Sequence, residues 1–478
     1  MAVLDHLEPK GVFHYFEELC SMPHGSGNTK IVSDWLVSFA RERGLKYYQD
    51  ELNNVIIIEE ATPGYENAEP VILQGHMDMV CEKAPDCDKN MDTEGLDLAV
   101  EGDTVLAKGT TLGGDDGIAV AMMLAIMDDP TLAHPRLECV FTVDEEVGME
   151  GAMGLDVSML QGRRLLNLDS EDEGIFTVSC AGGNMTACTV PVSREAFDGT
   201  ELTVTVSGLL GGHSGAEIHK GRANANKLMS RVLYTISKAT DVRLISVEGG
   251  LKDNAIPVRS TAVIAVADAD AARTVCETMA EALRNEYTVT DPGIRVTVTE
   301  SGEGVPMDKL SSDKIIFFLN CCPNGIHAMS ADIEGLVQTS LNLGILTTAD
   351  NEVKATFCIR SSVDSQKQML VDRVTNLTRF LGGTVAISGD YPGWQYRQES
   401  PLRDLLVDVF TEQYGHEPKV AAIHAGLECG LFSGKLPGLD CVSVGPDLDE
   451  IHTFRERLHI ASTQRLWAMV VETLRRMK

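Results

Sequence analysis

Three short apolar segments in the first third of the chain are each followed closely by histidine, aspartate or glutamate. The segments cover residues 70–73, 137–142 and 164–168. They are too short for helices and lack the polar alternation of a half-exposed strand, which is typical of buried strands in a parallel sheet. Open α/β sheets build their sites at the carboxyl ends of such strands. The sequence therefore predicts an α/β domain with a polar site at one sheet edge.

Five motifs carry the polar residues of this predicted site. They are Gly75-His76-Met77-Asp78, Gly113-Gly114-Asp115-Asp116-Gly117, Asp144-Glu145-Glu146-Val147-Gly148, Asn167-Leu168-Asp169-Ser170 and Glu450-Ile451-His452-Thr453. Zinc-type cations bind imidazole nitrogen and carboxylate oxygen, and a two-metal site needs about five such groups, one of which bridges. The motifs supply this number with His76, Asp115, Glu146, Asp169 and His452.

The remaining acidic residues of the motifs suggest supporting and catalytic roles. Asp78 lies two residues after His76, so in an extended segment its carboxylate is on the same side and can orient the second ring nitrogen. Glycines flank the pair Asp115-Asp116; we interpret Asp115 as the bridging ligand, while Asp116 shapes the turn. Glu145 precedes the ligand Glu146 and, pointing elsewhere, is the candidate general base for a water molecule.

Each motif alone also fits a less specific structure. A surface turn, a helix N-cap or a solvated acidic loop explains any one of them. A phosphate-binding loop at 113–117 is disfavoured, because no Gly-Lys-Ser/Thr follows and adjacent carboxylates repel phosphate. The combination of all five, most of them at predicted strand ends, favours one shared metal site.

Composition limits the partners of this chain. A net charge of −31 over 478 residues repels phosphate backbones and anionic lipid, and 5% aromatic residues provide little stacking surface for nucleic acid. The longest apolar run, 118–127, is half a membrane span. The first residues lack a secretion signal, and twelve cysteines without a Cys-x-x-Cys spacing suggest reduced thiols. We expect a cytoplasmic enzyme that binds neither nucleic acid nor membrane.

The pattern of predicted helices and strands changes twice along the chain. We predict a catalytic domain in two parts, 1–187 and 393–478, with a mostly parallel central sheet, and an inserted α+β lid domain at 188–392. Within the insert, a strand-helix-strand pattern occurs twice, at 261–299 and at 354–388. The insert is therefore expected to have two related halves.

Further motifs extend beyond the predicted metal ligands. They include Gly211-Gly212-His213-Ser214-Gly215, Arg222-Ala223-Asn224-Ala225, Lys252-Asp253-Asn254-Ala255-Ile256-Pro257, Ile359-Arg360-Ser361-Ser362 and His424-Ala425-Gly426-Leu427-Glu428-Cys429-Gly430-Leu431-Phe432. With these motifs the chain resembles the M20 metallopeptidases over its whole length. Among them it is most similar to the aminoacyl-histidine dipeptidases, also called peptidase D or Xaa-His dipeptidases.

The resemblance implies how two metal ions are shared. One ion is expected on His76, Asp115 and Asp169, the other on Asp115, Glu146 and His452. A cis peptide bond is expected between Asp115 and Asp116. The ions are expected to be Zn²⁺, with Co²⁺ or Mn²⁺ as alternatives.

The resemblance also assigns substrate contacts to the lid. His213, Asn254, Arg360 and Gly426 are expected to bind the substrate. Two positions depart from the family pattern: Asp116 stands where asparagine is frequent, and Thr453-Phe454-Arg455-Glu456 replaces Ser-Pro-Asp-Glu. These departures leave the metal preference open.

The expected activity is hydrolysis of dipeptides, either aminoacyl-histidine or broader Xaa-Xaa substrates. A tripeptidase or an N-acyl amino acid deacylase shares the same metal residues and differs in pocket shape. A non-catalytic scaffold is disfavoured because the base and all ligands are retained. The partner is a small peptide, and a homodimer is compatible with the sequence.

Overall fold

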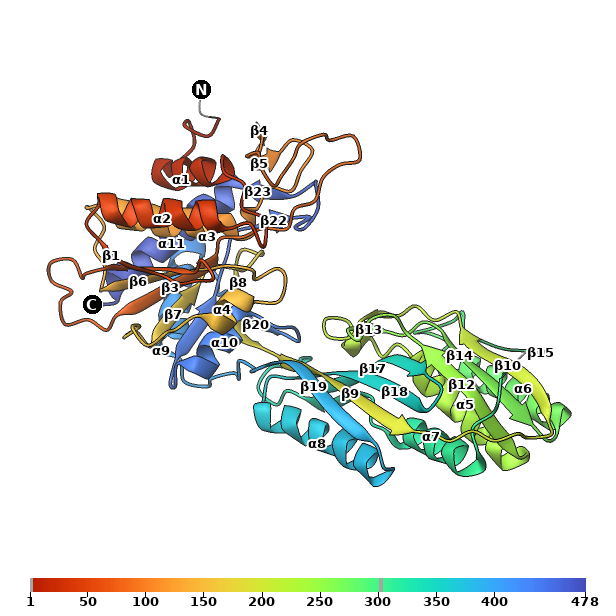
Figure 1. The fold of residues 1–478 in the computed structure, drawn as a ribbon. Helices are drawn as coiled ribbons and strands as arrows, with labels where there is room; N and C mark the ends of the chain where they lie inside the picture. The colour runs from red at the N-terminus through yellow and green to blue at the C-terminus, as the bar shows by residue number, and fades with distance from the viewer. Residues whose placement is uncertain (1–2, 301–303) are drawn as a thin grey trace. The chain divides into compact units, whose positions relative to one another are not determined.

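The computed structural model describes residues 3–300 and 304–478, which form two compact units (Figure 1). The first unit contains residues up to Ser179, Tyr396–Ala422 and Leu427–Lys478, and the second contains Cys180–Gln395 and Ile423–Gly426. The chain passes from the first unit to the second after Ser179, before the predicted boundary between residues 187 and 188. The reason is that β9 (Gly182–Pro191) pairs along its length with a strand of the second unit. The assignment of the short segment Ile423–Gly426 to the second unit was not predicted from the sequence.

Eight strands form the central sheet of the first unit, in the order β1-β2-β6-β3-β7-β21-β8-β20. Their bounds are β1 Lys46–Gln49, β2 Val55–Glu59, β3 Val71–His76, β6 Leu137–Thr142, β7 Arg164–Asn167, β8 Ile175–Cys180, β20 Lys419–Ile423 and β21 Asp440–Ser443. The central strands β6, β3, β7 and β21 are parallel, whereas β1, β2 and β8 pair antiparallel. The three predicted buried strands are β3, β6 and β7, and their carboxyl ends lie at the same edge.

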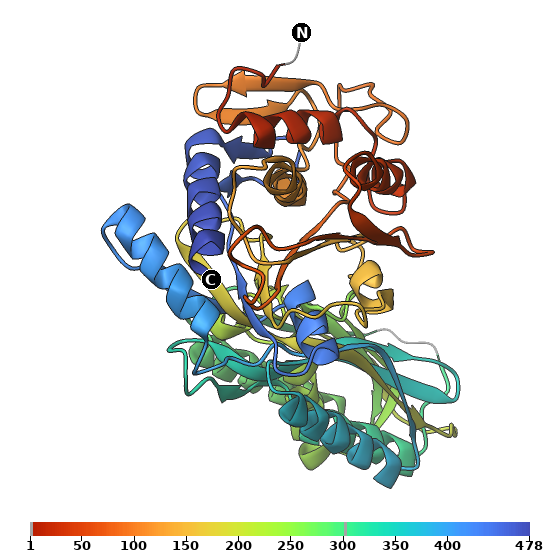
Figure 2. The same ribbon diagram turned by 90° about the vertical axis from the view of Figure 1, so that its left-hand side faces the viewer.

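Helices cover both faces of this sheet, which explains why its central strands β3 and β6 are buried along their whole length. The helices are α1 Lys10–Cys20, α2 Lys30–Glu42, α3 Gly114–Asp128, α4 Glu150–Gly154, α9 Pro401–Tyr414, α10 Glu428–Lys435 and α11 Ile460–Arg476. Figures 1 and 2 show α1, α2 and α3 on one side of the sheet and α10 on the other. Across the described residues, no helix is both long and apolar enough to span a membrane.

A small second sheet in the first unit positions the last motif. It has the order β22-β23-β5-β4, with β4 Leu98–Glu101, β5 Thr104–Ala107, β22 Leu448–Asp449 and β23 Arg457–His459. The loop 450–456 connects β22 to β23, and β23 pairs with β5. This pairing ties a segment near the C-terminus, with His452 in its loop, to strands that precede α3.

The second unit consists of one large antiparallel sheet and the helices that pack on it. The sheet order is β15-β10-β14-β12-β17-β18-β9-β19, with β16 paired to β17. The further strands are β10 Thr200–Ser207, β12 Val242–Gly249, β14 Ser260–Val266, β15 Arg295–Glu300, β16 Gly325–Met329, β17 Val337–Thr348, β18 Glu352–Ser361 and β19 Thr384–Tyr391. The helices are α5 Ala225–Ala239, α6 Ala269–Glu286, α7 Lys309–Cys321 and α8 Asp364–Phe380, with a short 3₁₀ turn at Ile218–Lys220.

The predicted repeat is present in this sheet. Its two copies are β14-α6-β15 and β18-α8-β19. In each copy an antiparallel strand, β10 or β9, lies between the first and the last strand, so these two strands are parallel. Both copies are therefore split βαβ units, and the second unit has two related halves.

Strand alternation gives the sheet of the second unit two different faces. Ala355, Phe357 and Ile359 on β18 belong to the apolar core that includes residues of the helices. Residues that alternate with them along β18, such as Cys358 and Arg360, project from the opposite face. That face therefore carries Arg360, one of the residues predicted from the sequence to bind the substrate.

Candidate metal centre

Two of the predicted ligands meet Asp115 at the carboxyl edge of the first unit's sheet. His76 is the last residue of β3, and Asp169 follows β7 by two positions. The Nε2 atom of His76 lies 3.1 Å from Oδ1 of Asp115 and 3.5 Å from Oδ1 of Asp169. His76 is 1% exposed, so these groups form a buried cluster.

A second cluster shares Asp115 with the first. Nε2 of His452 lies 3.1 Å from Oδ2 of Asp115 and 2.9 Å from Oε1 of Glu146. The two oxygens of Asp115 thus approach two different imidazoles, which is the arrangement of a bridging carboxylate. Glu146 Oε1 is buried and is not aligned for a hydrogen bond with His452, so it retains a free lone pair for a cation.

Glu456 holds the loop that carries Asp115. Its Oε2 accepts hydrogen bonds from the backbone N–H groups of Leu112 and Gly113, at 2.7 and 3.0 Å, and its Oε1 accepts from Gly114 and Asp115, at 2.8 and 3.3 Å. These are donors at the start of α3, where a carboxylate is favourable. In the sequence, Glu456 stood out only as part of a departure from the family pattern. The peptide bond between Asp115 and Asp116 is cis, as expected.

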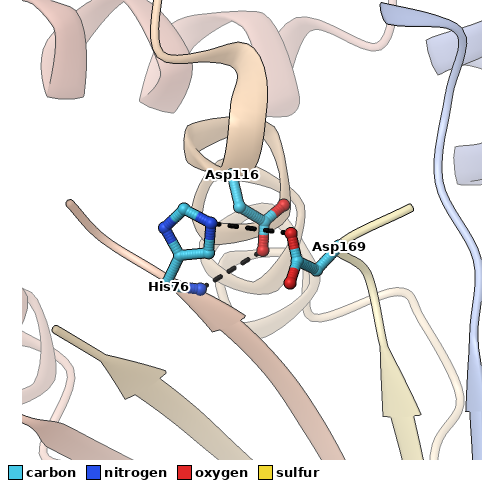
Figure 3. Close-up of side chains that lie close together, drawn as sticks. All are labelled: His76, Asp116 and Asp169. Atoms are coloured by element: carbon cyan, nitrogen blue, oxygen red, sulfur yellow. Dashed lines mark hydrogen bonds and ion pairs between the residues drawn. The ribbon is translucent and has the colours of Figure 1, made fainter. Parts of the chain in front are cut away.

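Asp116 lies in the turn before α3, as predicted, and its carboxylate also contacts the end of β3. The first turn of α3 is non-helical at Asp115 and Asp116, so both carboxylates face the end of β3. Asp116 is 2% exposed, and its Oδ2 accepts a hydrogen bond of 3.2 Å from the backbone N–H of His76 (Figure 3). A side chain at Gly75 would collide with this carboxylate, because an added Cβ would lie 2.4 Å from Oδ2. Gly75 is therefore required by the close approach of Asp116.

Asp78 contacts Nδ1 of His76 with its backbone oxygen and with its carboxylate. Nδ1 of His76 lies 2.9 Å from the backbone oxygen of Asp78, whereas the carboxylate Oδ1 is 3.5 Å away. The carboxylate accepts hydrogen bonds from the hydroxyl of Ser26, at 2.8 Å, and from the backbone N–H of Glu145, at 3.2 Å. Asp78 thus connects His76 to the segment that carries the glutamate pair. Ser26 was missed, since a lone serine near the N-terminus has no distinctive spacing.

Negative charge is concentrated at this edge. Burial, together with neighbouring carboxylates, raises the pKa of Asp169 to about 6 and that of Glu145 to about 9. The hydrogen bond with Asp115 and the close approach of the Glu146 carboxylate raise the pKa of His452 to about 10. A cation would relieve the repulsion among these carboxylates.

The donor set fits divalent metal binding. Among the described residues, three groups have donor atoms within 4.8 Å of one another: His76 with Asp116 and Asp169, His76 with Glu145 and Glu146, and Asp115 with Glu146 and His452. Nitrogen and oxygen ligands of this kind suit zinc-type ions. The third group is one of the two sets expected from the sequence. The first group contains Asp116 where Asp115 was expected.

Comparison with known proteins agrees with this chemistry. The chain is 37% identical over 480 residues to the cytosol non-specific dipeptidase of Escherichia coli, covering 99% of both proteins. The chain belongs to the M20 metallopeptidase family. The family's model of the peptidase dimerisation domain matches residues 204–291, within the second unit.

Solved structures show the same M20 fold. The aminoacylhistidine dipeptidase of Vibrio alginolyticus matches with a TM-score of 0.94 and 36% identity, over 99% of this chain and 97% of that one. A tripeptidase of Staphylococcus aureus matches with a TM-score of 0.56 and 16% identity, over 98% and 99% of the two chains. The second similarity concerns the fold alone.

The second unit of this M20 protein brings His213 next to Asn254. The short strand β11 (Gly212–His213) pairs with β13 (Ala255–Ile256), and the N–H of Ser214 donates to the backbone oxygen of Asn254 at 2.8 Å. Nδ1 of His213 accepts hydrogen bonds from the N–H groups of Gly215 and Ala216, at 3.2 and 2.9 Å. Nδ1 is therefore unprotonated, and Nε2 carries the proton. Burial and the charge of Arg360 lower the pKa of His213, so the ring is a neutral donor.

Arg360 and His424 complete a polar group around Gly215. A Cβ added at Gly215 would lie 2.4 Å from the backbone oxygen of His424, 3.0 Å from Cε1 of His213 and 3.1 Å from Nε of Arg360. Arg360 is 8% exposed and donates to the hydroxyl of Tyr391 at 3.1 Å, while its Nε has no partner among the described residues. This buried guanidinium is able to bind an anion.

His424 was missed as a separate candidate, although its motif was noted. Its Nε2 lies 2.7 Å from the hydroxyl of Ser340, and burial with the adjacent Arg360 lowers its pKa to about 3. The neighbouring Ala425 accepts a hydrogen bond from the N–H of Ala181 at 3.0 Å, which ties Ile423–Gly426, and with it Gly426, to the second unit.

Proposed function

We propose that the protein is a metal-dependent dipeptidase with a two-metal centre. The observation that carries this proposal is the position of Asp115, whose two oxygens approach the imidazoles of His76 and His452 at 3.1 Å each. Asp169 and Glu146 complete the two sets of ligands. The dipeptidases of E. coli and V. alginolyticus, at 37% and 36% identity, support the substrate class. Zn²⁺ is the proposed ion, because imidazole and carboxylate ligands suit it.

Glu145 is the proposed general base. Two divalent ions bound by these residues would lower the pKa of a water molecule and polarise the scissile carbonyl. Glu145 accepts the proton of that water and transfers it to the leaving amine. Its pKa of about 9 arises from burial and neighbouring carboxylates, and cations on those carboxylates would lower it. Asp78 holds the backbone N–H of Glu145 and so orients the base.

The residues of the second unit are proposed to recognise the substrate. His213, as a neutral Nε2–H donor, stabilises the developing oxyanion. Arg360 binds the terminal carboxylate, since a planar guanidinium matches its geometry. Asn254 and Gly426 contact the peptide. These assignments rest on the chemistry of the group around Gly215.

A substrate panel tests the proposal. The zinc-loaded protein is assayed for kcat/KM on dipeptides with and without a carboxyl-terminal histidine, on the matching tripeptides and on N-acyl amino acids. We expect turnover of dipeptides well above the other two classes. Faster hydrolysis of tripeptides or acyl amino acids would show that the proposed substrate class is wrong. The absence of turnover on every class would refute the proposed enzymatic activity.

Two further proposals concern the surroundings of the enzyme. We propose that it acts in the cytosol, as the name of the E. coli relative indicates for that protein. A homodimer remains a prediction. Light scattering after size-exclusion chromatography tests it by measuring the molar mass of the protein in solution.

A further inference from the structure

A buried polar network lies just below the metal centre in the first unit. Glu428, the first residue of α10, is 0% exposed. Its Oε2 accepts hydrogen bonds from Nε2 of Gln74, at 2.6 Å, and from the hydroxyl of Thr142, at 2.7 Å. Oε1 of Gln74 in turn accepts from Nδ2 of Asn167 at 2.7 Å. One carboxylate thus connects α10 to the three strands β3, β6 and β7.

Each strand residue of this network lies just before part of the metal centre. Gln74 precedes His76 by two positions on β3, and Asn167, the last residue of β7, precedes Asp169 by two. Thr142 is the last residue of β6, lies opposite His76 in the strand register, and precedes the acidic motif. Residues two apart on a strand share a face, so Gln74 and His76 project from the same side. The network therefore joins the strand ends from which the ligands extend.

A role in core stability alone does not account for Glu428. Burial raises the pKa of its carboxyl to about 8, which shows how unfavourable the ionised form is at this position. Its Oε1 and the Oδ1 of Asn167 have no hydrogen-bond partner among the described residues. Apolar residues of similar size usually make a core at least as stable as such a group does. Glu428 also belongs to none of the three groups with metal-ligand spacing among the described residues.

We propose that Glu428 is a positioning residue of the metal centre. By accepting hydrogen bonds from Gln74 and Thr142, it fixes the ends of β3 and β6 relative to each other, and through Gln74 it also fixes β7. The spacing of His76, Glu146 and Asp169 is thereby set before an ion binds. This inference rests on the proposed metal-dependent function.

Substitutions at Glu428 separate hydrogen bonding from charge. In Glu428→Gln the amide oxygen takes the place of Oε2 and still accepts both hydrogen bonds, because the free Oε1 position receives the amide nitrogen. In Glu428→Ala both donors lose their partner. A positioning role therefore predicts that glutamine restores what alanine removes.

The first measurement is the dissociation constant for Zn²⁺, obtained by competition with a chromophoric chelator on the full-length protein. We expect Glu428→Ala to weaken zinc binding by roughly tenfold to a hundredfold, as is typical when the support of metal ligands is lost. Its kcat should fall by a similar factor with little change in KM, while Glu428→Gln stays within about threefold of the wild type in both constants, since its hydrogen bonds are kept.

A milder pair of variants covers the case in which alanine disturbs folding. Thr142→Val removes one hydroxyl donor at nearly constant volume, and Thr142→Ser retains it. We expect weaker zinc binding in the first variant only. Thr473→Val is the matched control, because Thr473 is equally buried in the same unit and its hydroxyl donates to the backbone oxygen of Met469 in its own helix, at 2.7 Å. Circular dichroism verifies that each variant is folded at the assay temperature.

The outcomes are distinct. Wild-type zinc affinity in folded Glu428→Ala and in Thr142→Val would overturn the positioning role. Equal damage in Glu428→Gln and Glu428→Ala would also overturn it, since charge rather than hydrogen bonding would then matter. A wild-type protein that binds no zinc and hydrolyses no peptide would instead refute the proposed function.

Discussion

At the scale of single residues, two adjacent glutamates after β6 have different surroundings. Asp144 adopts a left-handed conformation, with φ of 56°, and turns the chain just before them. Glu146 Oε1 lies 2.9 Å from His452, whereas the backbone of Glu145 is held by Asp78. Glu145 nevertheless lies close enough to His76 to be a ligand itself. Its role therefore has to be decided by separating metal binding from turnover.

Glu145→Gln makes this separation. The amide cannot accept a proton, so we expect kcat to fall by about a hundredfold to ten-thousandfold while two zinc ions remain bound per chain. Metal content by mass spectrometry, beside kcat, checks both parts. Loss of one or both ions in this variant would place Glu145 among the ligands and leave the reaction without its proposed base.

Arg360 is expected to bind the free carboxylate of a dipeptide. Amidation of the substrate's carboxyl end should lower kcat/KM by roughly tenfold to a hundredfold, because a charge-assisted contact is lost. In Arg360→Ala the difference between acid and amide should nearly vanish, and Arg360→Lys should restore only part of it. Arg243→Ala is the control, since Arg243 is also 8% exposed and lies in the same sheet. An undiminished preference for the acid in Arg360→Ala would exclude Arg360 as the anchor.

At the scale of secondary-structure elements, the first turn of α3 depends on a residue far away in sequence. Glu456 is separated from Leu112 by 344 positions and accepts four backbone hydrogen bonds with both carboxylate oxygens. This differs from Glu428, where only Oε2 is used. The same substitution, glutamate to glutamine, should therefore have opposite consequences at the two positions.

In Glu456→Gln an amide NH₂ faces two of the backbone donors. We expect a loss of about 1 to 3 kcal/mol in the free energy of unfolding, because buried donors remain unsatisfied. Zinc binding should also weaken, since Asp115 follows directly in the chain. Urea denaturation and zinc competition measure the two effects. Unchanged stability and affinity would show that the loop before Asp115 does not need this carboxylate.

Elements with a local pattern were predictable from the sequence, and elements made by distant contacts were not. β3, β6 and β7 are rich in apolar residues because helices cover both faces of their sheet, and this pattern is visible in the residues themselves. The role of Asp116 depends on how close Gly75 brings it to His76. The support from Glu456 depends on the pairing of β23 with β5. No short sequence window contains these contacts.

At the scale of the whole molecule, the chemistry is divided between the two units. All five proposed metal ligands, the base and their supports lie in the first unit, although they come from segments as distant as His76 and His452. The group around Gly215, with His213 and Arg360, lies in the second unit. This division was predictable because the pattern of helices and strands changes near the unit boundaries. The second unit also contains the same strand-helix-strand pattern twice, and each copy is a complete split βαβ unit.

Metal removal should consequently affect one unit. A ligand that binds only the folded form stabilises it by about 2.7 kcal/mol at a hundredfold excess over its Kd. In hydrogen exchange followed by mass spectrometry, chelation should raise exchange by as much as about a hundredfold in β3, β6, β7 and the loop 450–456, since 2.7 kcal/mol corresponds to that factor. Exchange in β17 and β18 should stay constant, and added zinc should reverse the change. Equal loss of protection in both units would contradict a metal centre confined to the first unit, because its ligands would then have to stabilise the second unit as well.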